Sequence, residues 1–198
     1  MARDETERAE RLASWNQRHA DASTDPPEAC YLVAQYLGRL PRTGRAVDIA
    51  CGRGGNSLAL ARAGLETFAW DYSPVALDFL RQQAAAQNLR IHCQLVDLEH
   101  PDALSCPAFD VVVVSHYLHR PLLSRLQEML LPGGWLLYQG YLSTPRPLSG
   151  PGDPRFRLMP GELPRLLDKV QLLYYEEIGP DHASGLTNMV LFVARGGR

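Results

Sequence analysis

The sequence has few cysteines, little net charge and no long apolar run. Cys30, Cys51, Cys93 and Cys106 form no Cys-x-x-Cys pair and no regular spacing. This argues against a zinc site or a disulfide framework and favours reduced thiols in a cytoplasmic protein. Twenty basic residues against twenty-two acidic ones give a net charge of −2, so the composition does not indicate nucleic-acid binding through bulk charge.

Membrane and targeting signals are also missing. A largely apolar stretch, residues 109–114, has the length of a strand, whereas a membrane-spanning helix needs roughly 20 apolar residues. The first ten residues, MARDETERAE, are polar and acidic and lack the apolar segment of a signal peptide. We therefore expect no membrane partner. With 198 residues, 45% of them hydrophobic, the chain can form one domain with its own core.

What the sequence does contain is a regular alternation of strands and helices. Two helices are expected first, at 3–20 and 28–40, separated by the segment ADASTDPP. Strands follow at 45–50, 66–71, 91–97, 109–115 and 135–141, with helices at 56–64, 73–88 and 121–131. The alternation predicts parallel strands joined by right-handed crossovers, and hence a doubly wound α/β sheet with helices on both faces.

The regular alternation of strands and helices ends after residue 142. Residues 143–154 are rich in proline and glycine and predict a loop, which a short helix at 160–168 follows. Two last strands, 170–178 and 185–195, are joined only by GPDHAS and should form an antiparallel hairpin. The expected sheet has seven strands, mostly parallel with this antiparallel C-terminal hairpin.

The stretch VDIACGRGGNSLALA, residues 47–61, places a glycine-rich turn between a strand and a helix. Such a turn lets a ligand approach the backbone at the carboxyl end of a strand, although it also occurs as a plain tight turn. A dinucleotide fingerprint would have glycine or alanine where Ser57 stands. Asp48 would repel a pyrophosphate and suits a ligand with a positive group, such as an amine or a sulfonium.

Two further carboxylates come at the ends of the next strands. Asp71 can accept hydrogen bonds from both hydroxyls of a ribose, and Asp97 can accept one from the exocyclic amine of adenine. Each has an ordinary alternative, since Asp71 could cap a helix and Asp97 could be a loop acid. Together with Asp48 they indicate a nucleoside with a cationic amino-acid tail, which is S-adenosylmethionine.

These motifs resemble the cofactor half of the class I S-adenosylmethionine-dependent methyltransferases. VDIACGRGGNSLALA resembles their glycine motif, FAWDYSP their ribose-binding acidic motif and LVDLE their adenine-contacting motif. SWNQRHAD and CGRGGNSLALA most resemble the small tellurite-resistance and thiopurine methyltransferase-like group. The resemblance implies a Rossmann-like fold, S-adenosylmethionine as cofactor and a methyl acceptor as substrate.

By position, the resemblance implies twelve cofactor-binding residues: Trp15, Arg18, Asp48, Ala50, Gly52, Asn56, Asp71, Tyr72, Asp97, Leu98, Ser115 and His116. Trp15 and Arg18 would close over the site, with Arg18 suited to the cofactor carboxylate. The alternative for Trp15 is a helix anchor in the core. We expect one domain over 1–198, in which 1–24 form a helical lid and 143–160 a variable loop on the acceptor side.

Methyl transfer from a sulfonium is an in-line displacement, for which the protein supplies binding, orientation and exclusion of water. We therefore assign no catalytic side chain. His116 and His119 have metal-ligand spacing, but no third ligand is evident and we expect no metal. Tyr141 would face the same pocket unless it lies in the core.

The acceptor is expected to be a small molecule. SHYL stands where amino-methylating DNA and protein enzymes have asparagine, two prolines and an aromatic residue, and there is no basic tract for tRNA or DNA. Arg155 and Arg157 flank Phe156 and could take an anionic or aromatic acceptor, or could form a solvated loop. Two rival functions remain: a cofactor-binding module without turnover and a dinucleotide oxidoreductase. The sequence predicts no oligomeric state.

Overall fold

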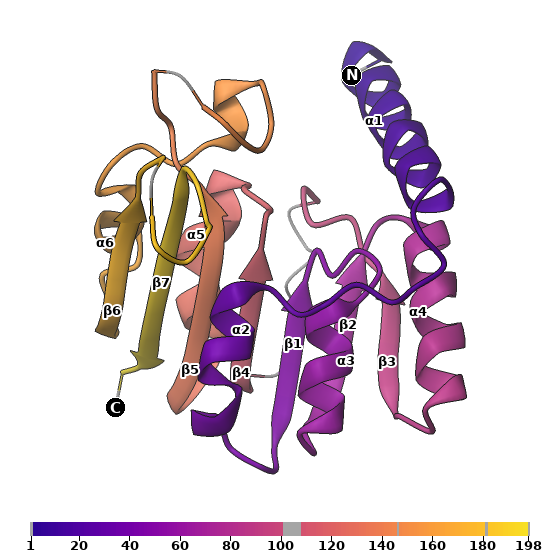
Figure 1. The fold of residues 1–198 in the computed structure, drawn as a ribbon, viewed down its shortest axis with the longest axis horizontal. Helices are drawn as coiled ribbons and strands as arrows, with labels where there is room; N and C mark the ends of the chain where they lie inside the picture. Colours follow the sequence, from indigo (N-terminus) through magenta and orange to yellow (C-terminus); the bar gives the residue numbers. More distant parts are fainter. Residues whose placement is uncertain (1, 101–107, 146, 181, 198) are drawn as a thin grey trace.

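The structure is a computed structural model that describes residues 2–100, 108–145, 147–180 and 182–197. The described residues form one seven-stranded sheet in the order β3-β2-β1-β4-β5-β7-β6 (Figure 1). Its strands are β1 (Arg45–Ile49), β2 (Glu66–Asp71), β3 (Ile91–Leu95), β4 (Phe109–Ser115), β5 (Leu130–Tyr141), β6 (Val170–Ile178) and β7 (Met189–Gly196).

The strand directions confirm the predicted fold. Strands β1 to β5 pair in parallel, and β7 pairs antiparallel with both β5 and β6. The C-terminal hairpin is therefore present, with β7 inserted between β5 and β6. The strand order reverses between β1 and β4, and the crevice at such a reversal is where open α/β sheets bind ligands.

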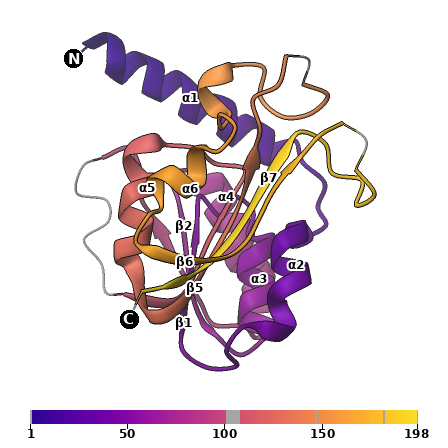
Figure 2. The same cartoon turned by 90° about the vertical axis from the view of Figure 1, so that its left-hand side faces the viewer.

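Helices cover both faces of the sheet (Figures 1 and 2). One face carries α2 (Tyr31–Tyr36), α3 (Gly55–Arg62) and α4 (Pro74–Ala86), and the other carries α5 (Arg120–Leu126) and α6 (Glu162–Leu166). Alternate residues of β4 enter the two cores. Val113 packs in the core with Leu32 and Leu60, whereas Val112 packs in the core with Leu122. A central strand buried on both faces explains the unbroken valine run.

Several element boundaries differ from the sequence prediction, notably at β5, at the second helix and at β7, which begins at Met189 instead of residue 185. Strand β5 begins at Leu130, where we predicted the end of a helix, because Leu130 already pairs with Phe109. The Pro-Gly-Gly segment 132–134 falls in the shift of register before Trp135, so the proline interrupts no regular ladder. The second predicted helix is short: α2 ends at Tyr36 and one 3-10 turn, Leu37–Arg39, completes it.

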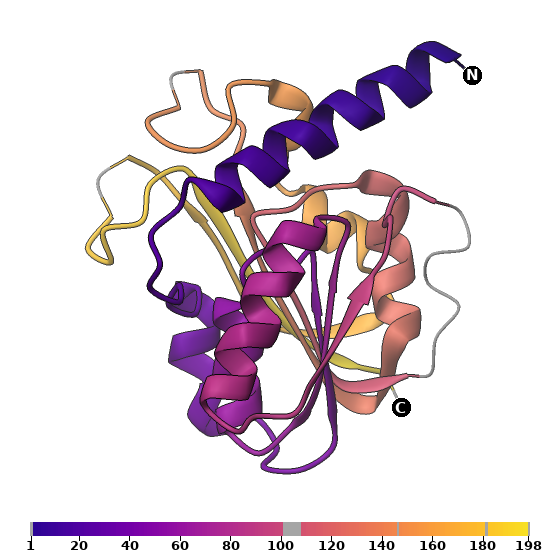
Figure 3. The same ribbon diagram turned by 90° about the vertical axis from the view of Figure 1, so that its right-hand side faces the viewer.

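The N-terminal helix α1 (Ala2–Ala20) lies across the end of the sheet at which the parallel strands finish (Figures 1 and 3). A hydrogen bond of 2.6 Å from Ser73 Oγ to Asn16 Oδ1 ties it to the start of α4. The loop that contains the 3-10 turn Pro154–Phe156 lies at the same end (Figure 2). Both segments thus approach the strand ends that carry the predicted site.

Candidate functional site

The turn between β1 and α3 forms the floor of the candidate site. Gly54, before the first residue of α3, has φ +82° and Gly52 has φ +52°, a region that glycine adopts without cost. Asp71, only 6% exposed, accepts hydrogen bonds from Gly52 N at 2.7 Å and from Ser73 N at 2.8 Å. Its carboxylate therefore joins the glycine turn to the start of α4.

Gly55 is required by close packing rather than by its φ angle. A Cβ atom there would collide with the backbone carbonyl of Glu28. We expect Gly55→Ala to lower the free energy of unfolding in urea by about 1–3 kcal/mol, the usual cost of overpacking. Gly38→Ala is the matched control, because nothing lies within 4 Å of a Cβ there. Equal stability of the two variants would contradict this account of the turn.

Asp48 lies beneath the turn and is fully buried. Its carboxylate accepts hydrogen bonds from Ser57 N at 3.1 Å, Ser57 Oγ at 2.6 Å and Asn56 Nδ2 at 3.4 Å. Burial raises the pKa of Asp48 to about 6, against the opposing effect of these bonds. The carboxylate has no exposed surface for a direct contact with an amine, which departs from our expectation. It instead holds the turn from behind.

Asn56 connects three elements across the strand reversal. Its Oδ1 accepts a hydrogen bond from Cys30 N at 2.9 Å, and its Nδ2 donates one to Ser115 Oγ at 2.9 Å. The residue is 6% exposed. The glycine turn, the entrance of α2 and the end of β4 are therefore fixed relative to one another.

Asp97 follows β3 and pairs with α1. Its Oδ2 forms an ion pair with Arg8, and its Oδ1 accepts a hydrogen bond from Glu99 N at 3.0 Å. Glu99 in turn accepts two hydrogen bonds from Arg11, at 3.1 and 2.8 Å, while Leu98 is buried. The predicted adenine motif is thus the docking point of α1. Arg8 and Arg11, three residues apart on one helix face, were not predicted.

Trp15 does not lie in the core, so the alternative interpretation as a core anchor is wrong. It is 42% exposed, with the Arg18 guanidinium 5.0 Å from its ring centroid and the His19 ring stacked at 5.7 Å. Near the C-terminal end of α1, the residues that approach the site are Asn16 and His19. Asn16 accepts a hydrogen bond from Ser73, and His19 lies beside Gly52. Burial lowers the pKa of His19, although Asp71 opposes the shift.

Two other residues of the predicted set, Ala50 and Tyr72, are half-buried at the ends of β1 and β2. Ala50 has φ +54°, which turns the backbone directly before the glycine turn. Burial raises the pKa of Tyr72. Both residues therefore border the same edge of the sheet as Asp71.

After β4 the chain turns at His116, which has φ +56°. Its backbone N–H donates to Gln139 O at 2.8 Å, and its ring centroid lies 5.3 Å from that of Tyr141. Tyr141 is half-buried and burial raises its pKa. Among the described residues, no group of three or more His, Cys, Asp or Glu side chains could hold a metal ion.

The loop at 143–160 is held from within by Arg157, and the two interpretations that we left open for this arginine are both wrong. Arg157 is 3% exposed and donates hydrogen bonds to the carbonyls of Leu142, Ser149 and Pro151. It is neither solvated nor available to an anionic acceptor. Arg155 is exposed and pairs with Asp153 at 2.7 Å.

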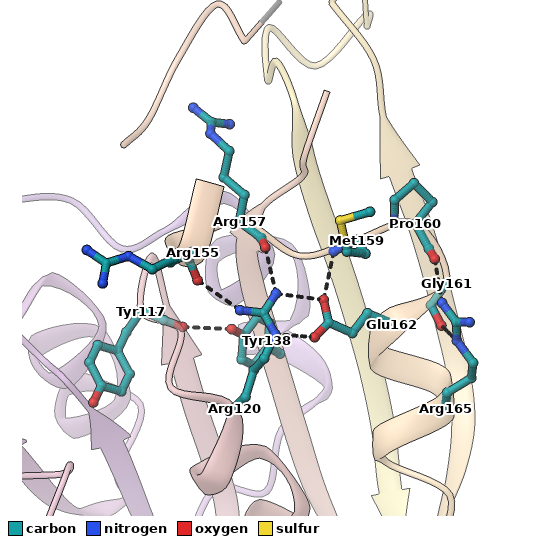
Figure 4. A network of polar contacts seen from close by, with 10 residues as sticks. All are labelled: Tyr117, Arg120, Tyr138, Arg155, Arg157, Met159, Pro160, Gly161, Glu162 and Arg165. Carbon is teal, nitrogen blue, oxygen red and sulfur yellow. Dashed lines mark hydrogen bonds and ion pairs between the residues drawn. The ribbon is translucent and has the colours of Figure 1, made fainter. Parts of the chain in front are cut away.

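Arg120, at the start of α5, joins this loop to α6 (Figure 4). It donates to Glu162 Oε1 at 2.6 Å and Oε2 at 3.0 Å, and to the carbonyls of Arg155 at 2.8 Å and Arg157 at 2.9 Å. An open cavity of about 220 Å³ lies between α1 and the loop, with Arg11 on one side and Phe156 on the other. Arg120 also lines this cavity, and its hydrogen bonds hold that side of the cavity in place. The cavity is therefore suited to a small molecule.

Comparison with known proteins gives consistent results. Residues 46–134 match the methyltransferase domain family. The probable S-adenosyl-L-methionine-dependent methyltransferase TehB of Haemophilus influenzae is 30% identical over 105 residues, which cover 50% of this chain and 37% of that protein. The chain spans between 26% and 44% of the length of the curated relatives that it matches.

Solved structures agree on the fold. The crystal structure of TehB from Haemophilus influenzae has a TM-score of 0.67 at 22% identity, over 83% of this chain and 60% of that chain. The [4+2]-cyclase SpnF has a TM-score of 0.65 at 19% identity, over 84% of this chain and 78% of that chain. Within the described part of the chain, none of the helices has the length and hydropathy to cross a bilayer.

Proposed function

We propose that the chain binds S-adenosylmethionine and methylates a small molecule, because residues 46–134 match the methyltransferase domain family and the fold is similar to that of TehB. The arrangement of the carboxylates supports this function most directly. Asp71 ends β2 and Asp97 follows the neighbouring strand β3, while Asp48 lies behind the turn after the adjacent strand β1.

Asp71 has the hydrogen-bonding capacity that ribose requires. A carboxylate offers about four lone-pair sites, of which Gly52 N and Ser73 N occupy two. The remaining two suit the two hydroxyls of the sugar. Adenine then extends toward Asp97 and Leu98 at β3, and the amino-acid part extends over Ala50 and the glycine turn, above the buried charge of Asp48.

The rest of the predicted set completes this proposal. Asn56 and Tyr72 lie at the two sides of the cofactor site. Ser115 and His116 lie next to the transferred methyl group. Trp15 and Arg18 belong to the lid, which residues 1–24 form. Residues 1–198 act as a single domain in the cytoplasm, with 143–160 as the acceptor-side loop. We assign no metal and no nucleic-acid partner.

Bound S-adenosylmethionine would supply an electrophilic methyl carbon for in-line displacement from its sulfur to the acceptor. The protein's part is to orient the two molecules and to exclude water. The cavity of about 220 Å³ beside Phe156 supports a small acceptor. The second candidate is a cofactor-binding module of this fold without turnover; the likeness to the [4+2]-cyclase SpnF shows that the fold also occurs in a protein named for another activity.

Calorimetry with S-adenosylmethionine and S-adenosylhomocysteine tests the proposal. We expect both nucleosides to bind the purified protein, and no binding of either at millimolar concentration by the folded chain would reject it. Incubation of a metabolite extract with cofactor labelled in its methyl group separates the two candidates. A labelled small-molecule product supports transfer, whereas binding without any product supports the module. A spectral response to a nicotinamide cofactor would instead revive the oxidoreductase.

The lid leads to a separate prediction on hydrogen exchange. S-adenosylhomocysteine packed below α1 should slow amide exchange in residues 8–20 several-fold, because Asn16 and His19 already lie against the site. Mass spectrometry of the protein with and without the nucleoside measures this effect. Strand β6, at the edge of the sheet opposite β3, serves as the internal control. Unchanged exchange in α1 in a nucleoside-saturated sample would remove the lid from the proposal.

A further inference from the structure

His116 stands at the place that a methyl acceptor must approach. It follows β4, next to β1 at the reversal of strand order. If ribose lies at β2 and adenine at β3, the sulfonium lies near the ends of β1 and β4, and the acceptor enters from the β4–β5 side. There His116 is partly open to solvent and lies beside Tyr141.

The neighbouring Gln139 determines which nitrogen of the His116 ring carries the proton. Gln139 is 2% exposed, and its Oε1 accepts a hydrogen bond from the backbone N–H of Leu32 at 3.0 Å. This bond fixes the orientation of the amide, because a backbone N–H can only donate. The amide nitrogen Nε2 therefore points toward His116, whose Nε2 lies 3.3 Å away.

An amide NH2 group only donates, so Nε2 of His116 has to accept. The ring is then neutral and carries its proton on Nδ1. Partial burial of the ring lowers the pKa of His116, which favours the same neutral form. No described residue accepts a hydrogen bond from Nδ1, so this N–H is free to meet a ligand.

The backbone supports the same conclusion. A left-handed φ such as the +56° of His116 is uncommon for residues other than glycine, and a hydrogen bond of 2.8 Å from His116 N to Gln139 O holds the backbone there. Gln139 thus holds both the backbone and the ring of His116. Unfavourable backbone conformations that the surroundings maintain in this way are concentrated at binding and catalytic sites.

We propose that His116 binds the methyl acceptor by donating a hydrogen bond from Nδ1 to an oxygen of that molecule, and that Gln139 is the positioning residue that fixes this tautomer. The inference rests on the proposed methyl transfer and narrows its substrate class. The acceptor carries a carboxylate, carbonyl or phenolate oxygen next to the atom that is methylated. His116 is not the general base, because Gln139 occupies its only lone pair.

Nitrogen NMR of histidine-labelled protein tests the tautomer. We expect the Nε2 signal of His116 in the unprotonated range and the Nδ1 signal in the protonated range at neutral pH. In Gln139→Glu the new carboxylate accepts from Nε2, and the Nε2 signal should move to the protonated range. A protonated Nε2 in the wild-type protein would overturn the proposal. His92 on β3 pairs with Glu66 and provides a reference signal that Gln139→Glu should not move.

Two thiols test the contact with the acceptor in protein saturated with S-adenosylhomocysteine. 2-Mercaptobenzoate carries a carboxylate next to its sulfur, and thiophenol lacks it. We expect the first to shift the Nδ1 proton of His116 and the second to leave it in place. An equal response to both, or no response to either at millimolar concentration, would overturn the proposed contact. Calorimetry on the same sample reports nucleoside binding separately, so a failure of the proposed function is distinguishable.

Discussion

Asp71→Ala is expected to weaken the binding of S-adenosylmethionine about 100-fold. Two hydrogen bonds from ribose to a charged acceptor contribute together about 3 kcal/mol, and every 1.4 kcal/mol corresponds to about tenfold in affinity. The variant also leaves Gly52 N and Ser73 N without their acceptor, which loosens the glycine turn. Calorimetry on the wild-type and variant proteins measures the change in Kd.

Two further variants separate binding from folding. Asp71→Asn keeps one acceptor oxygen and should give an intermediate loss, about tenfold. Asp78→Ala is the matched control, because Asp78 lies on the exposed face of α4 and pairs only with Arg81 at 2.6 Å among the described contacts. Its affinity should equal that of the wild type. If Asp71→Ala folds and binds with unchanged affinity, Asp71 does not bind ribose.

The second large effect concerns the dependence of stability on pH. Burial raises the pKa of Asp48 from 3.8 to about 6 in the folded chain. The folded chain therefore binds more protons than the unfolded chain between pH 4 and 6, so this residue makes stability fall as the pH rises through that window. A shift of about two pKa units corresponds to about 3 kcal/mol.

Asp48→Asn isolates this contribution, because the amide keeps the size of the side chain and one acceptor oxygen for Ser57 but does not titrate. Urea unfolding at a series of pH values gives the free energy of unfolding for both proteins. The wild type should lose stability relative to the variant as the pH rises from 4 to 6, and the difference should be constant above that range. Parallel curves through the whole series would contradict a raised pKa for Asp48.

The fold was predictable because it depends on the hydrophobic period of each segment and on the order of strands and helices along the chain. The valine run of β4 indicated a strand buried on both faces, and the strand–helix alternation gave the doubly wound sheet. The fold was confirmed, and residues 46–134 match the methyltransferase domain family. The start of β5 was missed because Pro132 and two glycines normally end an element, whereas here they fill a shift in register.

Within the site, sequence order gave the strand ends but not the direction of each side chain. Asp48 and Asp71 both stand at the positions that the motifs predict. Asp48 nevertheless has no exposed surface, because Ser57 and Asn56 enclose it. Arg157 was misjudged because its partners are backbone carbonyls of its own loop, which carry no sequence signal. The contact of Gln139 with His116 joins two strands and could only come from the structure.

The central claim is that one nucleoside lies along the ends of β1, β2 and β3. A crystal structure of the protein with S-adenosylhomocysteine tests it most directly. We predict ribose hydroxyls within hydrogen-bond distance of Asp71 and the adenine ring against Asp97 and Leu98. Density for the nucleoside at another surface of the molecule, with this edge of the sheet empty, would contradict the account.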